Sequence, residues 1–157
     1  MRTRPLGTTG YSVSELGFGA WGLGGGMWQG GSDSEAREAL RAAVDQGITF
    51  FDTALAYGQG HSERLIGAAL RSELTSGRVV VATKIPPRDG QWPGAAGTPL
   101  QDVFSPRHLS TSTEKSLKHL GVDGDSGDAA AGARAAECGG GRKGGARARD
   151  AGEARGA

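Results

Sequence analysis

Three residues with complementary chemistry, an acid, a phenol and an amine, stand at or just after the ends of apolar runs. Asp52 closes the run 48–52 (ITFFD), Tyr57 follows five positions later, and Lys84 follows the run 79–83 (VVVAT). If these runs are parallel strands, their carboxyl ends share one rim, where the three side chains can converge. A phenol, with an ordinary pKa of about 10, donates a proton more readily near neutral pH beside a cation. In this interpretation Tyr57 is the proton donor, Lys84 supplies the cation, and Asp52 holds Lys84.

The same residues also have a purely structural interpretation. Asp52 can cap a loop, Tyr57 can pack on that loop, and Lys84 can be a solvated strand end. The spacing alone leaves both interpretations open.

The elements that would position these residues alternate regularly along the chain. Short apolar runs at 16–20, 48–52 and 79–83 predict buried strands. Amphipathic segments between and after them predict three helices. Apolar strands alternating with amphipathic helices favour a parallel sheet covered by helices, either doubly wound or a (β/α)₈ barrel.

The helix ends have recognisable signals. The first helix starts with a capping-box pattern at 32–35 (SDSE) and stops at Gly47. The second starts at Ser62. The third has Ser105 as its cap and Pro106 in its first turn, and it stops at Gly121. Its weak apolar stripe consists of Leu109, Thr113, Ser116, Leu117 and Leu120.

A glycine pattern, G-x-G-x-x-G, is formed by Gly17, Gly19 and Gly22. A dinucleotide-binding fingerprint requires this pattern to open a helix directly after a strand. The next predicted helix starts only near Asp33, so a loop after the first strand is the favoured interpretation.

The overall composition argues against several classes of protein. A formal net charge of +1 gives no electrostatic case for nucleic acid or an anionic membrane. A single cysteine, Cys138, excludes an internal disulfide framework, which fits a cytoplasmic location. No signal peptide, membrane span or metal-ligand spacing is visible in the sequence.

The last part of the chain differs in composition from the rest. Residues 124–157 are rich in Gly, Ala and Arg and contain no Val, Ile, Leu, Met, Phe, Trp or Tyr. Such a segment cannot bury enough apolar surface to offset the entropy of ordering it. We therefore predict a folded region at 1–123 and a disordered tail at 124–157.

Four stretches resemble the aldo/keto reductases, in register over residues 2–123. The stretch GITFFDTALAYGQGHSERLIGAAL resembles that family's signature region, and VVVATKIPP resembles its third strand with the catalytic lysine. The stretch RPLGTTGYSVSELGFGAWGLGG resembles its N-terminal hairpin and first strand, and TEKSLKHLGVD resembles the helix before its fourth strand.

The resemblance implies a (β/α)₈ TIM barrel and NADPH-dependent reduction of small carbonyl substrates. By position, Asp52, Tyr57 and Lys84 would be three of the four catalytic residues. It implies that Gly19, Ala20 and Trp21 lie near the nicotinamide together with Asp52, and that Trp21 and Tyr57 line the substrate pocket.

The sequence departs from the family where a fourth strand ending in a catalytic histidine is expected. The stretch GDSGDAAAGARAAECGGG stands there instead, and His61, His108 and His119 all lie elsewhere. We therefore expect an incomplete barrel, truncated or frame-shifted after Asp123, and inactive as it stands. The alternative is a non-enzymatic remnant or a half-barrel bound to a partner; the sequence leaves the oligomeric state open.

Overall fold

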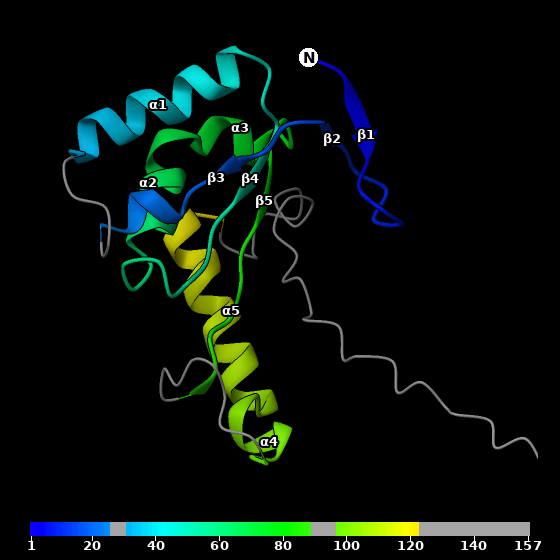
Figure 1. The fold of residues 1–157 in the computed structure, drawn as a ribbon, viewed down its shortest axis with the longest axis vertical. Coiled ribbons are helices and arrows are strands. Elements are labelled where there is room, and N and C mark those ends of the chain that lie inside the picture. Colours follow the sequence, from blue (N-terminus) through cyan, green and yellow to red (C-terminus); the bar gives the residue numbers. More distant parts are fainter. Residues whose placement is uncertain (26–30, 89–96, 123–157) are drawn as a thin grey trace, which may run out of the picture.

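The structure is a computed structural model, and it describes residues 1–25, 31–88 and 97–122. The predicted disordered tail at 124–157, including Cys138, lies outside the described residues and stays a prediction. The described chain alternates strands and helices after an N-terminal hairpin, as Figure 1 shows.

The N-terminal hairpin consists of β1 (Thr3–Pro5) and β2 (Ser12–Ser14), which pair antiparallel as the sequence predicts. Its outer charges pair, because Glu15 accepts from the guanidinium groups of Arg2 and Arg4. The hairpin is attached to the main sheet by reciprocal bonds. The Ser14 N–H donates to Thr49 Oγ1, and the Thr49 N–H donates to Ser14 Oγ, both at 2.9 Å.

The main sheet is parallel, with the order β3 (Phe18–Gly19), β4 (Phe50–Asp52) and β5 (Val80–Ala82). The prediction that 48–52 and 79–83 form neighbouring parallel strands is confirmed by the β4–β5 pairing. The regular strands are shorter than the predicted runs, although backbone bonds of flanking residues, such as Val80 N–H to the Thr49 oxygen, extend the pairing of β4 and β5. Within the described residues the sheet is open and no closed barrel forms.

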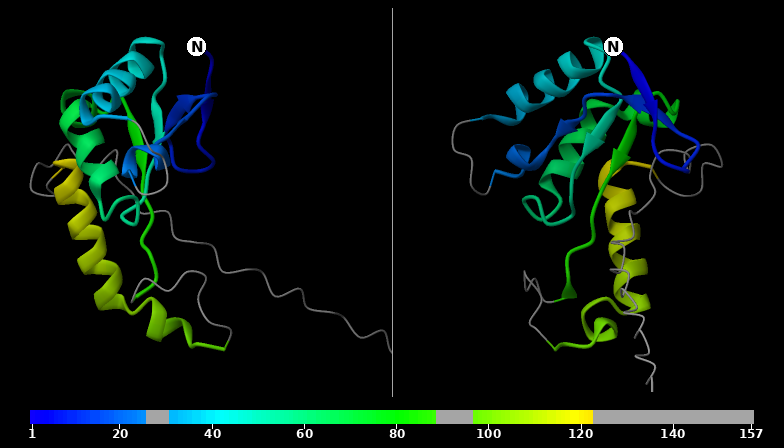
Figure 2. Two further views of the ribbon diagram at one scale, coloured as in Figure 1. Left: turned by 60° about the vertical axis from the view of Figure 1, so that its left-hand side comes forward. Right: turned by 45° about the vertical axis from the view of Figure 1, so that its right-hand side comes forward.

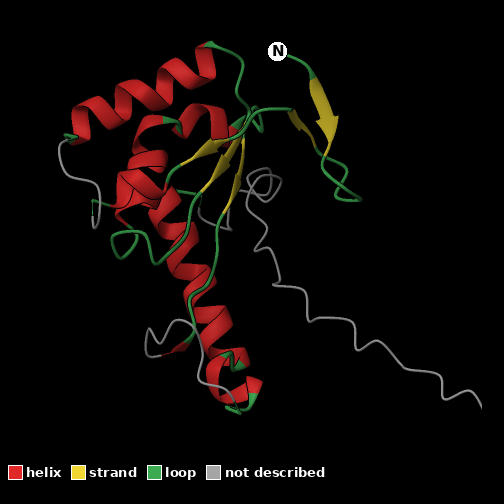
Figure 3. Ribbon diagram, viewed as in Figure 1, coloured by secondary structure: helices red, strands yellow, loops and turns green. Residues whose placement is uncertain are grey.

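Helices α1 (Asp33–Asp45), α2 (His61–Ala69) and α5 (Pro106–Leu120) correspond to the three predicted helices. Helix α2 starts one residue before the predicted Ser62. Three short elements were not predicted: the 3₁₀ helix η1 (Trp21–Gly24), α3 (Arg71–Thr75) and α4 (Leu100–Val103). Figure 3 shows the helices on one side of the three parallel strands.

The core lies between one face of the sheet and the helices, which cover that face from one side (Figure 2). Phe51 and Val81 are fully buried there, and their register places them side by side with Phe18. The helical side of this core is apolar and comprises Leu40 and Val44 of α1, Leu65 and Ile66 of α2, and Leu120 of α5. Successive strand residues point to opposite faces of a sheet, so Asp52, which follows Phe51, lies on the face away from the helices.

The apolar stripe predicted for α5 is partly wrong. Leu109 is 38% exposed, whereas Ser112, Ser116 and Leu120 are buried. The helix presents its small side chains inward because α2 comes very close at Gly67, where a Cβ would lie 2.7 Å from the backbone oxygen of Leu120.

The cap of α1 makes a prediction about acid stability. The predicted capping box is present, with the Ser32 N–H donating to Glu35 Oε2 at 2.7 Å. This backbone hydrogen bond, with the Ser32 hydroxyl, lowers the pKa of Glu35 from its ordinary 4.5. A carboxyl whose pKa is lower in the folded state stabilises the fold above its unfolded pKa, and this contribution fades as the pH falls through the folded pKa.

We therefore expect Glu35→Ala to lower the urea midpoint at neutral pH, and the difference from the unaltered chain to shrink at a pH of about 3. Glu38→Ala is the matched control, because it removes a carboxylate of the same helix that takes no part in the cap. A Glu35→Ala deficit as large in acid as at neutral pH would contradict this account of the cap.

Candidate active site

The three chemistry-bearing side chains meet at the carboxyl ends of β4 and β5. Lys84 Nζ donates to Asp52 Oδ1 at 2.6 Å, to the backbone oxygen of Thr53 at 2.8 Å and to Tyr57 Oη at 3.4 Å. It also lies 5.1 Å from the centre of the Tyr57 ring. All three protons of the ammonium thus have acceptors, and the lysine is oriented toward the phenol oxygen.

The cluster is partly open to solvent. The Lys84 side chain is 48% exposed and that of Asp52 is 43% exposed. An ion pair this exposed adds little to stability, on the order of 1 kcal/mol or less. Its geometry therefore matters more for orienting Lys84 than for holding the fold together.

Backbone bonds beyond the regular strands position Lys84. The Thr53 N–H donates to the Ala82 oxygen at 2.8 Å, and the Leu55 N–H donates to the Lys84 oxygen at 3.1 Å. These two bonds continue the β4–β5 ladder to the rim. Further along, His108 Nε2 lies 2.8 Å from the Pro86 oxygen, which ties the chain after Lys84 to α5.

The loop that carries Tyr57 has an unusual backbone. Gly58, Gln59 and Gly60 all have positive φ, and Gln59 at 53° is the one non-glycine residue with positive φ in the described ranges. The two glycines adopt this conformation without steric cost, whereas for Gln59 it costs energy and persists where the surrounding structure enforces it, often at functional sites. The loop packs closely against η1, because a Cβ on Gly58 would collide with the backbone oxygen of Gly24.

The residues predicted near a nicotinamide adjoin Asp52. Gly19 pairs with Asp52 in the parallel register, and the Ala20 N–H donates to the Asp52 oxygen at 2.8 Å. Trp21 starts η1 and is 50% exposed. The G-x-G-x-x-G stretch is therefore followed by a 3₁₀ turn, and α1 begins only at Asp33, in line with the loop interpretation.

The three histidines of the chain are all described, and the ring of none hydrogen-bonds to Tyr57. His61 Nε2 lies 2.9 Å from Asp33 Oδ1, His108 contacts Pro86, and His119 Nδ1 lies 2.8 Å from Glu63 Oε2. The prediction that no histidine ends a strand holds for the described residues.

Two buried polar residues beside the site were not identified from the sequence. Ser62 and Glu63 are both fully buried in the first turn of α2. Ser62 bonds to Thr53 and Ala20, whereas Glu63 accepts from the Thr83 hydroxyl at 2.7 Å and contacts His119. Two polar residues at the start of a helix normally indicate a solvated cap. The only sequence signal for the burial of Ser62 and Glu63 is their position between Tyr57 and the apolar stripe of α2.

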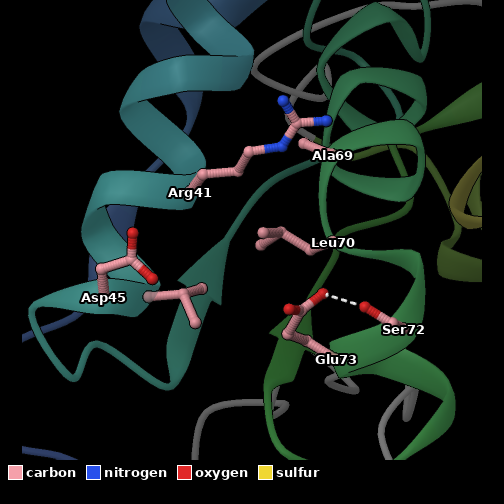
Figure 4. A pocket seen from close by; sticks show the side chains of 7 residues that line it. Arg41, Asp45, Ala69, Leu70, Ser72 and Glu73 are labelled. Atoms are coloured by element: carbon pink, nitrogen blue, oxygen red, sulfur yellow. Dashed lines mark hydrogen bonds between the residues drawn. The ribbon is translucent and has the colours of Figure 1, made fainter.

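A pocket exists elsewhere, between α1 and the α2–α3 segment (Figure 4). Its polar lining includes Arg41, Asp45, Ser72 and Glu73. The Ser72 hydroxyl donates to Glu73 Oε2 at 2.7 Å, and this bond is the main cause that lowers the pKa of Glu73. None of the predicted site residues lines this pocket.

The described residues hold no group of three or more His, Cys, Asp and Glu side chains able to bind a metal ion. None of the helices described is both long and apolar enough to span a membrane.

Comparison with known proteins gives a consistent match. The model of the aldo/keto reductase family matches residues 15–124. Aldo-keto reductase YhdN of Bacillus subtilis is 43% identical over 84 residues, which is 54% of this chain and 25% of that protein. The NADH-specific methylglyoxal reductase of Escherichia coli is 36% identical over 129 residues, which is 78% of this chain and 39% of that protein.

Solved structures agree with these matches. The holo form of aldo-keto reductase AKR11C1 from Bacillus halodurans superimposes with a TM-score of 0.60 at 30% identity, covering 78% of this chain and 37% of that one. An aldo-keto reductase from Klebsiella pneumoniae in complex with NADPH gives 0.51 at 29% identity, covering 71% and 33%. The chain thus spans well under half the length of these proteins.

Proposed function

Because the chain belongs to the aldo/keto reductase family of oxidoreductases, we propose that it carries the proton-donating part of a carbonyl-reducing site. The observation that supports this most is the contact of Lys84 Nζ with both Asp52 Oδ1 and Tyr57 Oη. We further propose that β3, β4 and β5 correspond to the first three strands of a (β/α)₈ barrel.

In the proposed mechanism, a small aldehyde or ketone lies with its oxygen against Tyr57 Oη. A bound nicotinamide nucleotide supplies the hydride that reduces the carbonyl carbon. Tyr57 gives its phenolic proton to the carbonyl oxygen, which becomes the hydroxyl of the product alcohol. The charge of Lys84 stabilises the phenolate that remains, and Asp52 keeps Lys84 aimed at it.

The residues beside Asp52 fit the nicotinamide end of such a cofactor. A Cβ built on Gly19 would meet no atom within 4 Å, so space is open beside the Asp52 rim. Gly19, Ala20 and Trp21 would hold the ring there, and Trp21 would also face the substrate. NADPH is the proposed nucleotide; NADH is the second candidate to test, because one relative's name specifies NADH.

We expect the 157-residue chain alone to show no carbonyl turnover. Hydride transfer depends on holding the two reactants in a close, aligned geometry, and losing that alignment forfeits several kcal/mol of barrier reduction. The residues proposed to hold the cofactor lie at its nicotinamide end, and the ring of no histidine hydrogen-bonds to Tyr57. The alternative function, a non-enzymatic remnant or partner-bound half-barrel, predicts the same absence of turnover.

The test is nucleotide absorbance with a panel of aldehydes, using NADPH and NADH separately, for the chain and its Tyr57→Phe and Tyr11→Phe variants. Tyr11, the other tyrosine of the chain, provides the matched control. Turnover that disappears only in Tyr57→Phe would contradict the inactive state and leave the proton-donor proposal standing. Fluorescence titration with either nucleotide separates the two functions, since a remnant without a cofactor site should not bind.

A further inference from the structure

Ser62 makes three hydrogen bonds to three separate segments of the chain. Its hydroxyl donates to the Ala20 backbone oxygen at 2.8 Å and accepts from Thr53 Oγ1 at 2.9 Å. Its backbone N–H donates to the Tyr57 oxygen at 3.3 Å. Ser62 is fully buried, as are Thr53 and Ala20, so water does not compete for these bonds.

Each of the three segments carries a residue of the proposed site. Ala20 immediately precedes Trp21. Thr53 follows Asp52, and its backbone oxygen accepts a hydrogen bond from Lys84 Nζ at 2.8 Å. Tyr57 is bonded directly. Ser62 therefore connects the segment of Ala20 and Trp21, the Asp52–Lys84 pair and the loop that carries Tyr57.

We propose that Ser62 is a positioning residue that keeps these three segments in register. This inference rests on the proposed function, which names the three segments as one site. Ser62 touches no reacting atom; it acts through Ala20, Thr53 and Tyr57. The hydroxyl of Ser62 is what ties the Ala20 oxygen to α2. The other hydrogen bond to that oxygen comes from the Leu23 N–H at 3.2 Å, which is local and reaches no other segment.

The test is amide hydrogen exchange of the full chain, followed by NMR, for Ser62→Ala. The Ala20 amide bonds to Asp52 at the rim, whereas the Val80 amide bonds to the Thr49 oxygen at the opposite end of the sheet. We expect exchange at Ala20 to accelerate about tenfold relative to Val80, the effect of local release of one hydrogen-bonded turn. The indole N–H signal of Trp21, assigned with Trp21→Phe, should shift in the same variant.

Two variants serve as controls. Ser116 Oγ is buried and has no hydrogen-bond partner in the part of the chain that the structure describes, so Ser116→Ala removes a buried hydroxyl without touching the site. Thr53→Val removes the bond from Thr53 but keeps the bond from Ser62 to Ala20. Both should leave the ratio of the Ala20 and Val80 exchange rates unchanged.

The inference is wrong if the Ala20 and Val80 rates rise by one common factor in Ser62→Ala, because Ser62 would then contribute only to global stability. If Ser62→Ala does not fold, Ser62→Cys, which keeps the volume and weakens the donor, is measured by the same ratio. No nucleotide or carbonyl enters this experiment. A failure to bind nucleotide would therefore count against the proposed function and not against the role of Ser62.

Discussion

Tyr57→Phe should lower carbonyl turnover by about 10²–10⁴-fold in a chimera in which residues 1–122 replace the matching segment of the Escherichia coli methylglyoxal reductase. The match to that enzyme extends over 129 residues, so the host would supply the part of the barrel that follows. The expected loss is large because phenylalanine keeps the ring but removes the proton that the product alcohol requires.

The chimera is assayed with methylglyoxal and NADH, the substrate and cofactor in the name of the host. Tyr11→Phe in the same chimera is the matched control and should retain full turnover, since Tyr11 lies at the hairpin. The two variants must have the same circular dichroism spectrum and the same affinity for the nucleotide, so that a difference in turnover does not come from folding or cofactor binding. Turnover that survives Tyr57→Phe under these conditions would exclude Tyr57 as the proton donor.

His119→Ala should lower the free energy of unfolding by about 2–3 kcal/mol, the cost of leaving a buried side-chain oxygen without its hydrogen-bond partner. Glu63 is fully buried, and its two carboxylate oxygens contact Thr83 Oγ1 and His119 Nδ1. The His119 side chain is itself only 14% exposed. Without the imidazole, one carboxylate oxygen of Glu63 is left buried with no donor.

Urea unfolding at neutral pH measures this loss. His108→Ala is the matched control. The ring of His108, on the same helix, makes one hydrogen bond to a backbone oxygen and lies beside Phe104, and its removal should cost about 1 kcal/mol. The double variant Glu63→Leu with His119→Leu should be more stable than His119→Ala, since it removes the buried acid along with its partner. A His119→Ala cost no larger than that of His108→Ala would show that the pair contributes little.

The convergence of the site could be predicted because it depends on local patterns. Asp52 and Lys84 each follow an apolar run, and parallel strands bring such ends to one rim. The capping box before α1 and the glycine stop after α5 are local signals too, and both were correct.

The buried polar junction could not be predicted, because its partners are distant in sequence. Glu63 and His119 are 56 residues apart, and Ser62 and Ala20 are 42 apart. A serine and a glutamate in a first helical turn have the composition of a solvated cap, and only the tertiary contacts of Ser62 with Ala20 and Thr53, and of Glu63 with His119, show otherwise. The exposure of Leu109 could not be predicted either. It lies on nearly the same face of α5 as the buried Leu120, eleven residues away, but the close approach of α2 is at Leu120, near the other end of the helix.

The contacts of the segment between Tyr57 and Ser62 fix the number of residues that this connection can have. Exposed connections usually accept insertions at little energetic cost, but this one is anchored at Tyr57, at Gly58 against Gly24, and at Ser62. One added or deleted residue would rotate the start of α2 by about 100° relative to its anchors. Both Ser62 and Glu63 would then leave the positions from which they reach the strand ends. Insertions and deletions among natural relatives are therefore expected on either side of this segment and not within it.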